Sequence, residues 1–298
     1  MSMNKITVAG SGVLGSQIAF QTAYHGYAVA LYDISDAVLE KARATLRSLG
    51  KRYETDIEAT QNDIDAAMGR IAMTTDLGTA LADADLLIEA IPELIAIKME
   101  FYGRAGSLAP AKTIFATNTS TLLPSQLADA TGRSARFLAL HFANEIWKRN
   151  IAEVMGHAGT DRDAFDAVIA FAKSIGMVAL PIHKEQPGYL TNSVLIPWII
   201  ASLKLWADDV ADFKTIDRSW RIGSGSTFVP FAVMDMVGLN TAYNTFSTMA
   251  EAQKDQLLAK VAQRLKAEFI DKGRLGVATG EGFYEYPDPE FLAPGFLS

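Results

Sequence analysis

A histidine and a glutamate twelve positions apart have the clearest capacity for proton transfer in this sequence. His141 follows the apolar segment 137–140, and Glu153 lies between apolar neighbours in the strand-like segment 151–155. A carboxylate in such surroundings is costly without a partner. If the two strands are adjacent, Glu153 can accept the Nδ1 proton of His141, which leaves Nε2 free to take a proton from a hydroxyl group. A histidine at the end of a strand is also compatible with a purely structural role.

Two uncharged polar residues, Ser120 and Asn192, lie where a side chain could face a ligand. Ser120 lies in the run 118–121, which follows a strand-like segment and precedes a helical pattern. Its hydroxyl could cap that helix or, at the carboxyl edge of a sheet, donate to a substrate oxygen. Asn192 lies in an otherwise apolar helical segment, where an amide without partners is costly. We therefore expect Asn192 either to cap a turn or to point into a cleft.

A glycine-rich turn near the N-terminus has the spacing of a phosphate-binding loop. Gly10, Gly12 and Gly15 follow the strand-like segment 6–9 and open a helical pattern. The three glycines permit a tight turn, a close approach of the backbone to a pyrophosphate, and close packing of helix on strand. Asp33, at the end of the next strand, can bind the ribose hydroxyls and repel a 2′-phosphate, which favours NAD over NADP. The alternative is that the glycines only serve turns and that Asp33 caps the next helix.

The elements that must position these residues alternate along the first half of the chain. Strand, helix and strand repeat over about 30 residues, which predicts a parallel sheet with right-handed crossovers. The polar, helix-prone segment 46–70 is longer than a crossover needs, and it predicts an inserted helical hairpin. We expect strands at 6–9, 28–32, 70–74, 85–90, 113–117, 137–141, 151–155 and 177–180, with helices that include 94–108 and 161–175.

The second part of the chain follows a linker, Gln-Pro-Gly at 186–188, and is helical throughout. Its segment 194–200 is apolar on every side, so we expect it to be buried, in part against another subunit. Pro197 should kink the helix that contains it. The helices of this part are expected at 189–207, 212–223, 231–249 and 255–272.

These patterns define the fold class and the domains. We expect an α/β protein whose Rossmann-type, doubly wound and mostly parallel sheet carries the inserted hairpin, in a domain formed by residues 1–184. An all-α domain, residues 185–298, should follow and bind the substrate or a second subunit. The length of 298 residues agrees with two domains.

Composition excludes several classes of function. With 49% apolar residues, 20% charged residues and a net charge of −7, the chain resembles neither a disordered protein nor a nucleic-acid-binding one. It has no cysteine, and its four histidines lack the spacing of metal ligands, so we expect no disulfide and no metal site. No apolar run reaches the roughly 18 residues of a membrane span. The first residues run directly into a strand, so we expect no signal peptide and a cytoplasmic protein.

Taken in order, these motifs resemble the 3-hydroxyacyl-CoA dehydrogenase family, and 3-hydroxybutyryl-CoA dehydrogenases in particular. The resemblance is collinear over nearly the whole chain. It rests on GSGVLG at 10–15, Asp33, ADLLIEAIPE at 84–93, NTST at 118–121, HFAN at 141–144, Glu153, PGYLTN at 187–192, PFAVMDMVGLN at 230–240 and GEGFYEY at 280–286.

The resemblance implies an NAD-binding domain and a helical domain that forms a homodimer. It implies hydride transfer between NAD and C3 of a 3-hydroxyacyl-CoA, giving the 3-oxoacyl-CoA, in fatty-acid metabolism. By position, His141 is then the general base, Glu153 its partner, and Ser120 and Asn192 bind the substrate oxygen. Lys51, on the inserted hairpin, falls where the family places a lysine against the CoA phosphates. The cofactor-binding residues that the resemblance implies are Gly10, Gly12, Val13, Leu14, Gly15, Asp33, Glu89, Glu93, Lys98, Asn118 and Asn144.

The chain departs from the family pattern at two places. The usual HFFNPVP is replaced by HFANEIW at 141–147, followed by Lys148 and Arg149, and the usual GPFEL is VPFAV at 229–233, without its glutamate. The departures leave two other functions open. One is dehydrogenation of a free 3-hydroxy acid of the gulonate or carnitine type, with Lys148 and Arg149 binding the carboxylate. The other is a non-catalytic, dinucleotide-binding structural protein, as in lens crystallins with this fold.

Overall fold

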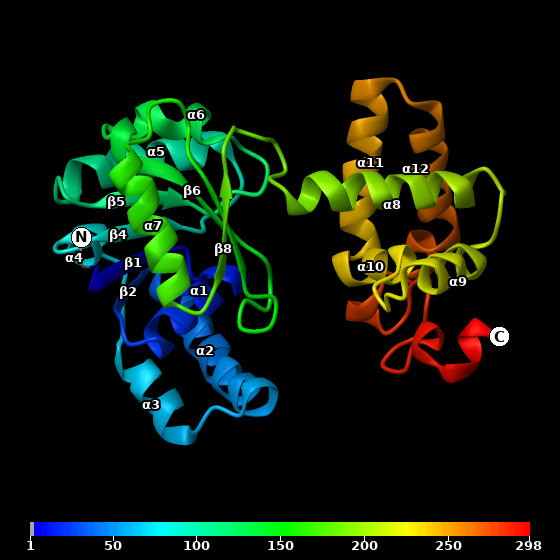
Figure 1. Ribbon diagram of the computed structural model, residues 1–298, viewed down its shortest axis with the longest axis horizontal. Helices are drawn as coiled ribbons and strands as arrows, with labels where there is room; N and C mark the ends of the chain where they lie inside the picture. The colour runs from blue at the N-terminus through cyan, green and yellow to red at the C-terminus, as the bar shows by residue number, and fades with distance from the viewer. Residues whose placement is uncertain (1–2) are drawn as a thin grey trace. The chain divides into compact units, whose positions relative to one another are not determined.

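A computed structural model describes residues 3–298. The chain divides into two units, Met1–Leu190 and Thr191–Ser298. The first contains every strand of the main sheet, and the second is helical, as the two-part pattern of the sequence predicts (Figure 1).

The first unit is built on an eight-stranded sheet with the order β3-β2-β1-β4-β5-β6-β7-β8. All neighbouring strands are parallel except β6 and β7. A connection of eight residues, 143–150, joins β6 to β7, and it is too short for the crossover that a parallel pair requires. The structure thus confirms the predicted Rossmann-type, mostly parallel sheet. The strands are β1 Lys5–Ala9, β2 Ala28–Tyr32, β3 Ile71–Thr74, β4 Leu86–Glu89, β5 Ile114–Thr117, β6 Phe137–Phe142, β7 Ile151–Met155 and β8 Val178–Ile182.

The helices of this unit include the predicted inserted hairpin, which consists of α2 and α3 (Figure 1). Ser35 begins α2 by accepting a hydrogen bond from the Val38 N–H, and Thr60 begins α3 as part of a capping box. The apolar face of α2 packs in the same core cluster as β1, β2 and β4. The helices are α1 Val13–Tyr24, α2 Asp36–Ile57, α3 Gln61–Gly69, α4 Leu77–Leu81, α5 Ile95–Leu108, α6 Pro124–Leu127 and α7 Arg162–Ser174.

The carboxyl ends of β1, β4, β5 and β6 share one edge of the sheet. The register pairs Ala9 with Glu89, Glu89 with Thr117, and Thr117 with Ala139. The glycine turn, the segment 90–94, the run 118–121 and the end of β6 therefore emerge side by side, where ligands of such sheets bind.

The second unit contains five helices longer than one turn and differs from the sequence prediction in two places. The single helix expected at 231–249 is wrong, because Gly238, with a φ of +90°, separates α10 from α11. The helix expected from Tyr189 begins at Thr191, and Tyr189 itself has a φ of +56°. Pro197 lies inside α8, which continues past it. These helices are α8 Thr191–Ala207, α9 Phe213–Ser224, α10 Pro230–Val237, α11 Leu239–Gln253 and α12 Gln256–Glu268.

Within residues 3–298, no helix combines the length and the apolar character that a membrane span requires.

Candidate active site

The turn between β1 and α1 requires glycine at two of its three motif positions. Gly10 has a φ of +97°, and a Cβ there would lie 2.4 Å from the carbonyl oxygen of Ala90. At Gly15 a Cβ would lie 1.9 Å from the carbonyl oxygen of Gly10. These two glycines therefore allow the turn and the close approach of α1 to the sheet.

Gly12 has a different role, since a Cβ there would meet no atom within 4 Å. Its φ of −63° is open to any residue, and as the N-cap of α1 it offers no side chain to the first N–H groups of the helix. Val13 is exposed and Leu14 is partly buried. Open space in front of an uncapped helix start fits an anionic group, and the pyrophosphate of a dinucleotide is such a group.

Asp33 lies at the end of β2 beside this turn. One of its carboxylate oxygens accepts hydrogen bonds from the backbone N–H and the hydroxyl of Ser11, both at 2.7 Å. The other oxygen accepts the Ile34 N–H, also at 2.7 Å. Three donors thus hold the carboxylate in one orientation. A negative charge at this position suits ribose hydroxyls and disfavours a 2′-phosphate.

His141 and Glu153 are brought together by the antiparallel pairing of β6 and β7. The two residues are direct register partners, and His141 Nδ1 lies 2.8 Å from Glu153 Oε2. Glu153 is buried, and its Oε1 accepts the Leu190 N–H at 2.9 Å. Because a carboxylate can only accept, the proton of this bond belongs to His141 Nδ1. Nε2 makes no hydrogen bond within residues 3–298. The predicted contact between His141 Nδ1 and Glu153, with Nε2 left free, is thus confirmed.

Tyr189 covers the imidazole of His141. The two rings stack with their centroids 4.6 Å apart and an interplanar angle of 26°. The side chain of Tyr189 is fully buried. Together with the carboxylate of Glu153, this ring fixes the plane of the imidazole.

The segment that follows β5 reaches the same edge. Asn118 Oδ1 accepts the Phe142 N–H at 2.9 Å, which ties the end of β5 to the end of β6. Ser120 does not cap a helix, because α6 begins only at Pro124. Among the described residues, neither the hydroxyl of Ser120 nor the exposed amide of Asn144 has a hydrogen-bond partner. Both side chains are therefore available to a ligand.

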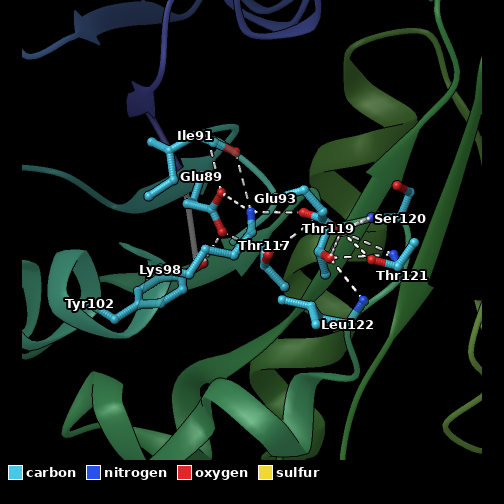
Figure 2. Close-up of polar contacts among 10 residues, drawn as sticks. All are labelled: Glu89, Ile91, Glu93, Lys98, Tyr102, Thr117, Thr119, Ser120, Thr121 and Leu122. Carbon is cyan, nitrogen blue, oxygen red and sulfur yellow. Dashed lines mark hydrogen bonds and ion pairs between the residues drawn. The ribbon is translucent and has the colours of Figure 1, made fainter. Parts of the chain in front are cut away.

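Glu89 and Lys98 form a buried ion pair behind this edge (Figure 2). Lys98 Nζ lies 2.5 Å from Glu89 Oε1, and the side chains are 1% and 0% exposed. Glu89 also accepts the Ile91 N–H at 3.0 Å and the hydroxyls of Tyr102 and Thr117 at 3.0 and 2.8 Å. Burial raises the pKa of Tyr102 well above its ordinary value, so its hydroxyl remains a donor. Glu89 and Lys98, which the resemblance places among the cofactor-binding residues, are thus both buried and paired with each other.

Glu93 connects the buried pair to the turn after β5 (Figure 2). Its Oε2 lies 3.2 Å from Lys98 Nζ. Its Oε1 accepts the N–H groups of Ser120 and Thr121, at 3.0 and 3.1 Å, and the hydroxyls of Thr119 and Thr121. Although burial works to raise it, the pKa of Glu93 is lowered, because the Thr119 hydroxyl and the Lys98 charge favour the carboxylate. Glu93 therefore organises the turn that carries Ser120.

The other predicted residues lie on α2, on the loop after β6 and in the second unit. Lys51 is exposed on α2, as is Arg47 one helical turn earlier, and neither forms an ion pair with any described residue. Lys148 and Arg149 do pair with acidic side chains, at 3.4 and 3.8 Å, so the cations invoked for a free-acid substrate are engaged within the chain. Asn192 lies in the first turn of α8 and belongs to the second unit.

Within residues 3–298, no three histidine, aspartate or glutamate side chains gather as a metal ion would require.

Comparison with known proteins agrees with this geometry. The NAD-binding domain of 3-hydroxyacyl-CoA dehydrogenase matches residues 5–186, and the C-terminal domain of the same enzymes matches residues 188–286. The chain belongs to the 3-hydroxyacyl-CoA dehydrogenase family. It is an NAD-dependent dehydrogenase, and its first unit is the NAD-binding domain.

Three relatives show how far the similarity of this dehydrogenase extends. The mitochondrial hydroxyacyl-coenzyme A dehydrogenase of Homo sapiens is 30% identical over 94% of this chain and 90% of its own length. A probable 3-hydroxybutyryl-CoA dehydrogenase of Bacillus subtilis is 31% identical over 97% and 99%. The solved structure of a diketoreductase, described for its dual catalysis of dicarbonyl compounds, is 48% identical, with a TM-score of 0.92 over 96% of this chain and 100% of that one.

Sequence reasoning missed three residues of this site: Ser11, Tyr102 and Tyr189. Tyr102 follows Lys98 by four positions on α5, so helical spacing could have placed both side chains on one face. Ser11 and Tyr189 had no comparable signal, because each acquires its role through a contact with a residue distant in the sequence, Asp33 and His141 respectively.

Proposed function

We propose that this dehydrogenase interconverts a 3-hydroxyacyl-CoA and the corresponding 3-oxoacyl-CoA. The observation that carries the proposal is the His141–Glu153 pair, whose 2.8 Å contact lies at the carboxyl edge of an NAD-binding sheet. Full-length relatives named for this activity, at 30 and 31% identity, support it.

The polar side chains of the site have separate roles in this proposal. Glu153 holds the Nδ1 proton of His141 and stabilises the imidazolium, so that Nε2 can take the hydroxyl proton from the substrate and return it in the reverse direction. Acceptance of the hydride from C3 is the chemistry that NAD supplies when it is bound. The hydroxyl of Ser120 binds the substrate oxygen, and Asn144 orients the imidazole or the cofactor. For the amide of Asn192, the proposed role in binding the substrate oxygen rests on the family resemblance alone.

Replacement of His141 is the decisive test. Because His141→Gln removes the group that takes the proton from the substrate hydroxyl and returns it in the reverse direction, the rate should fall by about 100-fold or more in either direction. The dissociation constant of NADH should stay within about twofold, since the imidazole lies outside the glycine turn. The assay is NADH oxidation with acetoacetyl-CoA, combined with fluorescence titration of NADH. A wild-type enzyme inactive on thioesters of every chain length would disprove the proposal, as would a much smaller loss in His141→Gln.

The proposed NAD site lies in the first unit, at the glycine turn and the carboxyl edge of the sheet. Gly12→Ala tests it without disturbing the fold, because a Cβ at this position meets no protein atom. We expect the affinity for NADH to fall about 10-fold, because the methyl group occupies the approach of the pyrophosphate. The contrasting variant is Gly15→Ala, which should lower stability. The residues proposed to form the site are Gly10, Gly12, Val13, Leu14, Gly15, Asp33, Glu93, Asn118 and Asn144, with Glu89 and Lys98 supporting them.

Lys51 is proposed to bind the phosphates of CoA. Its exposed ammonium and the guanidinium of Arg47 are one helical turn apart and unpaired within the described chain. Lys51→Ala should therefore raise KM for acetoacetyl-CoA about 10-fold and leave kcat unchanged. Lys41→Ala, on the same helix, is the matched control. An unchanged KM in Lys51→Ala would count against a CoA contact here.

A second candidate function is reduction of a dicarbonyl compound that carries no CoA. It is favoured by the diketoreductase structure, which is 48% identical where the acyl-CoA enzymes are near 30%. Rates on acetoacetyl-CoA and on a dicarbonyl ester of similar length separate the two candidates. A dicarbonyl reductase should prefer the ester and be indifferent to Lys51→Ala.

We also propose that the second unit forms a homodimer and that the enzyme is cytoplasmic, where NAD is available. Trp198 stacks with Phe228, at 5.7 Å between centroids, and contacts Trp220 at 5.2 Å. Trp220 and Phe228 are each 42% exposed, and Val194 on the same helix as Trp198 is more exposed still, which suits a second copy as the partner. Sedimentation equilibrium should show a dimer that Trp220→Lys weakens, and cell fractionation tests the location.

A further inference from the structure

The connection between β6 and β7, residues 143–150, is fastened to α2 by side chains to which the proposed mechanism assigns no role. It directly follows the strand that carries His141 and precedes the one that carries Glu153. In Figure 1 it extends from the sheet beside α2. We call this fastening the clasp; it consists of Glu145, Trp147 and Lys148 in the loop and of Arg52 and Asp56 on α2.

The clasp combines ion pairs with an aromatic contact. The guanidinium of Arg52 binds the carboxylate of Glu145 and lies over the Trp147 ring, 4.6 Å from its centroid. The Trp147 indole N–H donates to Asp56 Oδ2 at 2.9 Å, and Lys148 Nζ lies 3.4 Å from the other oxygen. Trp147 is only 7% exposed. The loop is thus held to α2 through the charged side chains of Glu145 and Lys148 and through the ring of Trp147.

A second attachment joins the loop to α1, the helix whose start faces the dinucleotide site. Gln17 Oε1 accepts the N–H of Glu145 at 2.8 Å and that of Ile146 at 3.4 Å. Gln17 is buried and lies two residues after Gly15. Movement of the loop relative to α1 would therefore change the position of the dyad strands relative to the cofactor helix.

The backbone of the loop needs this support. Glu145 has a φ of +62°, a left-handed conformation that a Cβ disfavours. Its carbonyl oxygen accepts the N–H groups of Lys148 and Arg149, both at 2.8 Å, so the tight turn depends on this conformation. Residues 143–150 contain no proline that would restrict this backbone, and the clasp supplies side-chain contacts that hold it.

We propose that the clasp sets the distance between the catalytic dyad and the nicotinamide, and that Arg52 and Glu145 are positioning residues for hydride transfer. They act by fixing the turn that begins at Asn144, three residues after His141. The inference rests on the proposed dehydrogenase function of this site. Hydride transfer is sensitive to such placement, since an error of about 1 Å can cost about 100-fold in rate.

The test uses Arg52→Ala and Glu145→Ala in the full-length enzyme, with Arg43→Ala as the matched control. Arg43 is an exposed arginine of the same helix that pairs with Glu40 at 3.4 Å and does not contact the loop. Each clasp variant should lose about 10-fold in kcat, while the dissociation constant of NADH stays within about twofold. The primary deuterium isotope effect with deuterated NADH should rise, because hydride transfer becomes more rate-limiting. Arg43→Ala should match the wild type in all three measurements.

Exchange of the two charges separates the ion pair from the individual side chains. Arg52→Glu and Glu145→Arg should each impair kcat, and the double variant should recover it to within about threefold of the wild type. Single variants that stay within about twofold of the wild type overturn the proposal. It is also overturned by a double variant no faster than the single ones, or by an isotope effect that does not change.

Amide hydrogen exchange distinguishes failure of this inference from failure of the proposed function. The measurement needs no substrate, and residues 143–150 should exchange faster in Arg52→Ala than in Arg43→Ala. If the wild type turned over neither thioesters nor dicarbonyl compounds, the proposed function would fall, yet the exchange would still test the clasp. Equal exchange in the two variants would show that the clasp does not hold the loop.

Discussion

Both units of this dehydrogenase bury carboxylates, but they stabilise them by different means. In the first unit, Glu89 is paired with the equally buried Lys98. In the second unit, Asp217 accepts the hydroxyl of Tyr284 at 2.8 Å and a backbone N–H at 3.1 Å. Asp235 accepts three donors: two backbone N–H groups and a tyrosine hydroxyl. Neither aspartate forms an ion pair with a lysine or arginine of the described chain.

The difference appears in the ionisation of the two aspartates. Burial raises the pKa of Asp217 to about 7, and the neighbouring carboxyl of Asp235 contributes to the rise. Burial also raises the pKa of Asp235, although its three hydrogen-bond donors and the charge of Arg274 work to lower it. Where a cation is buried with the acid, the charges balance; where only neutral donors are present, the acid tends to keep its proton. The two units should therefore respond differently to mutation and to pH.

Removal of the balancing cation should have the largest effect. Lys98→Met leaves the Glu89 carboxylate buried without an opposite charge, so the free energy of unfolding should fall by about 3–5 kcal/mol. The matched control is Lys112→Met, which breaks an exposed pair with Asp85 and should cost about 1 kcal/mol or less. Urea unfolding of the full-length enzyme measures both. Equal losses in the two variants would mean that the buried pair is not what stabilises this edge.

Local patterns in the sequence predicted much of this molecule. The strand and helix periods, with Gly10, Gly12 and Gly15 between them, determine the sheet and its glycine turn within a few neighbouring residues. The meeting of His141 and Glu153 could also be predicted, because their strands are consecutive and joined by a short loop.

Contacts between distant segments could not be predicted in this way. Tyr284 reaches Asp217 across 67 positions, and no local period indicates such a bond. The break at Gly238 was missed because its neighbours continue a helical apolar pattern, although glycine there adopts a φ of +90° and the next N–H bonds to Leu275. The burial of Lys98 could not be predicted either, because a lysine on a helix is expected at the protein surface.

The next prediction concerns the pH dependence of the second unit. The pKa of Asp217 in the folded state, about 7, lies above the value of roughly 3.9 for an unfolded chain. Its contribution to stability is therefore full below the unfolded value and is lost as the pH rises through 7. Asp217→Asn stays neutral and keeps an acceptor for Tyr284. Relative to the wild type, this variant should gain on the order of 3 kcal/mol in unfolding free energy between pH 5 and pH 8.

The control for this measurement is Asp208→Asn. Asp208 is an exposed aspartate of the same unit, paired with Lys260 at 3.2 Å. Its difference from the wild type should be similar at both pH values. A gain in Asp217→Asn that does not depend on pH would contradict the assignment of a protonated Asp217 below neutrality.

The smallest effects should come from removing one tyrosine donor in each unit. Tyr102→Phe takes a 3.0 Å bond from Glu89, and Tyr286→Phe takes a 3.0 Å bond from Asp235. Each loss should cost about 1–2 kcal/mol in unfolding free energy. Because burial raises the pKa of Asp235, this carboxyl ionises as the pH rises, and the cost of Tyr286→Phe should then grow as the charged form loses a donor. A cost of Tyr286→Phe that is the same at pH 5 and pH 8 would contradict the raised pKa of Asp235 and remove this distinction between the two networks.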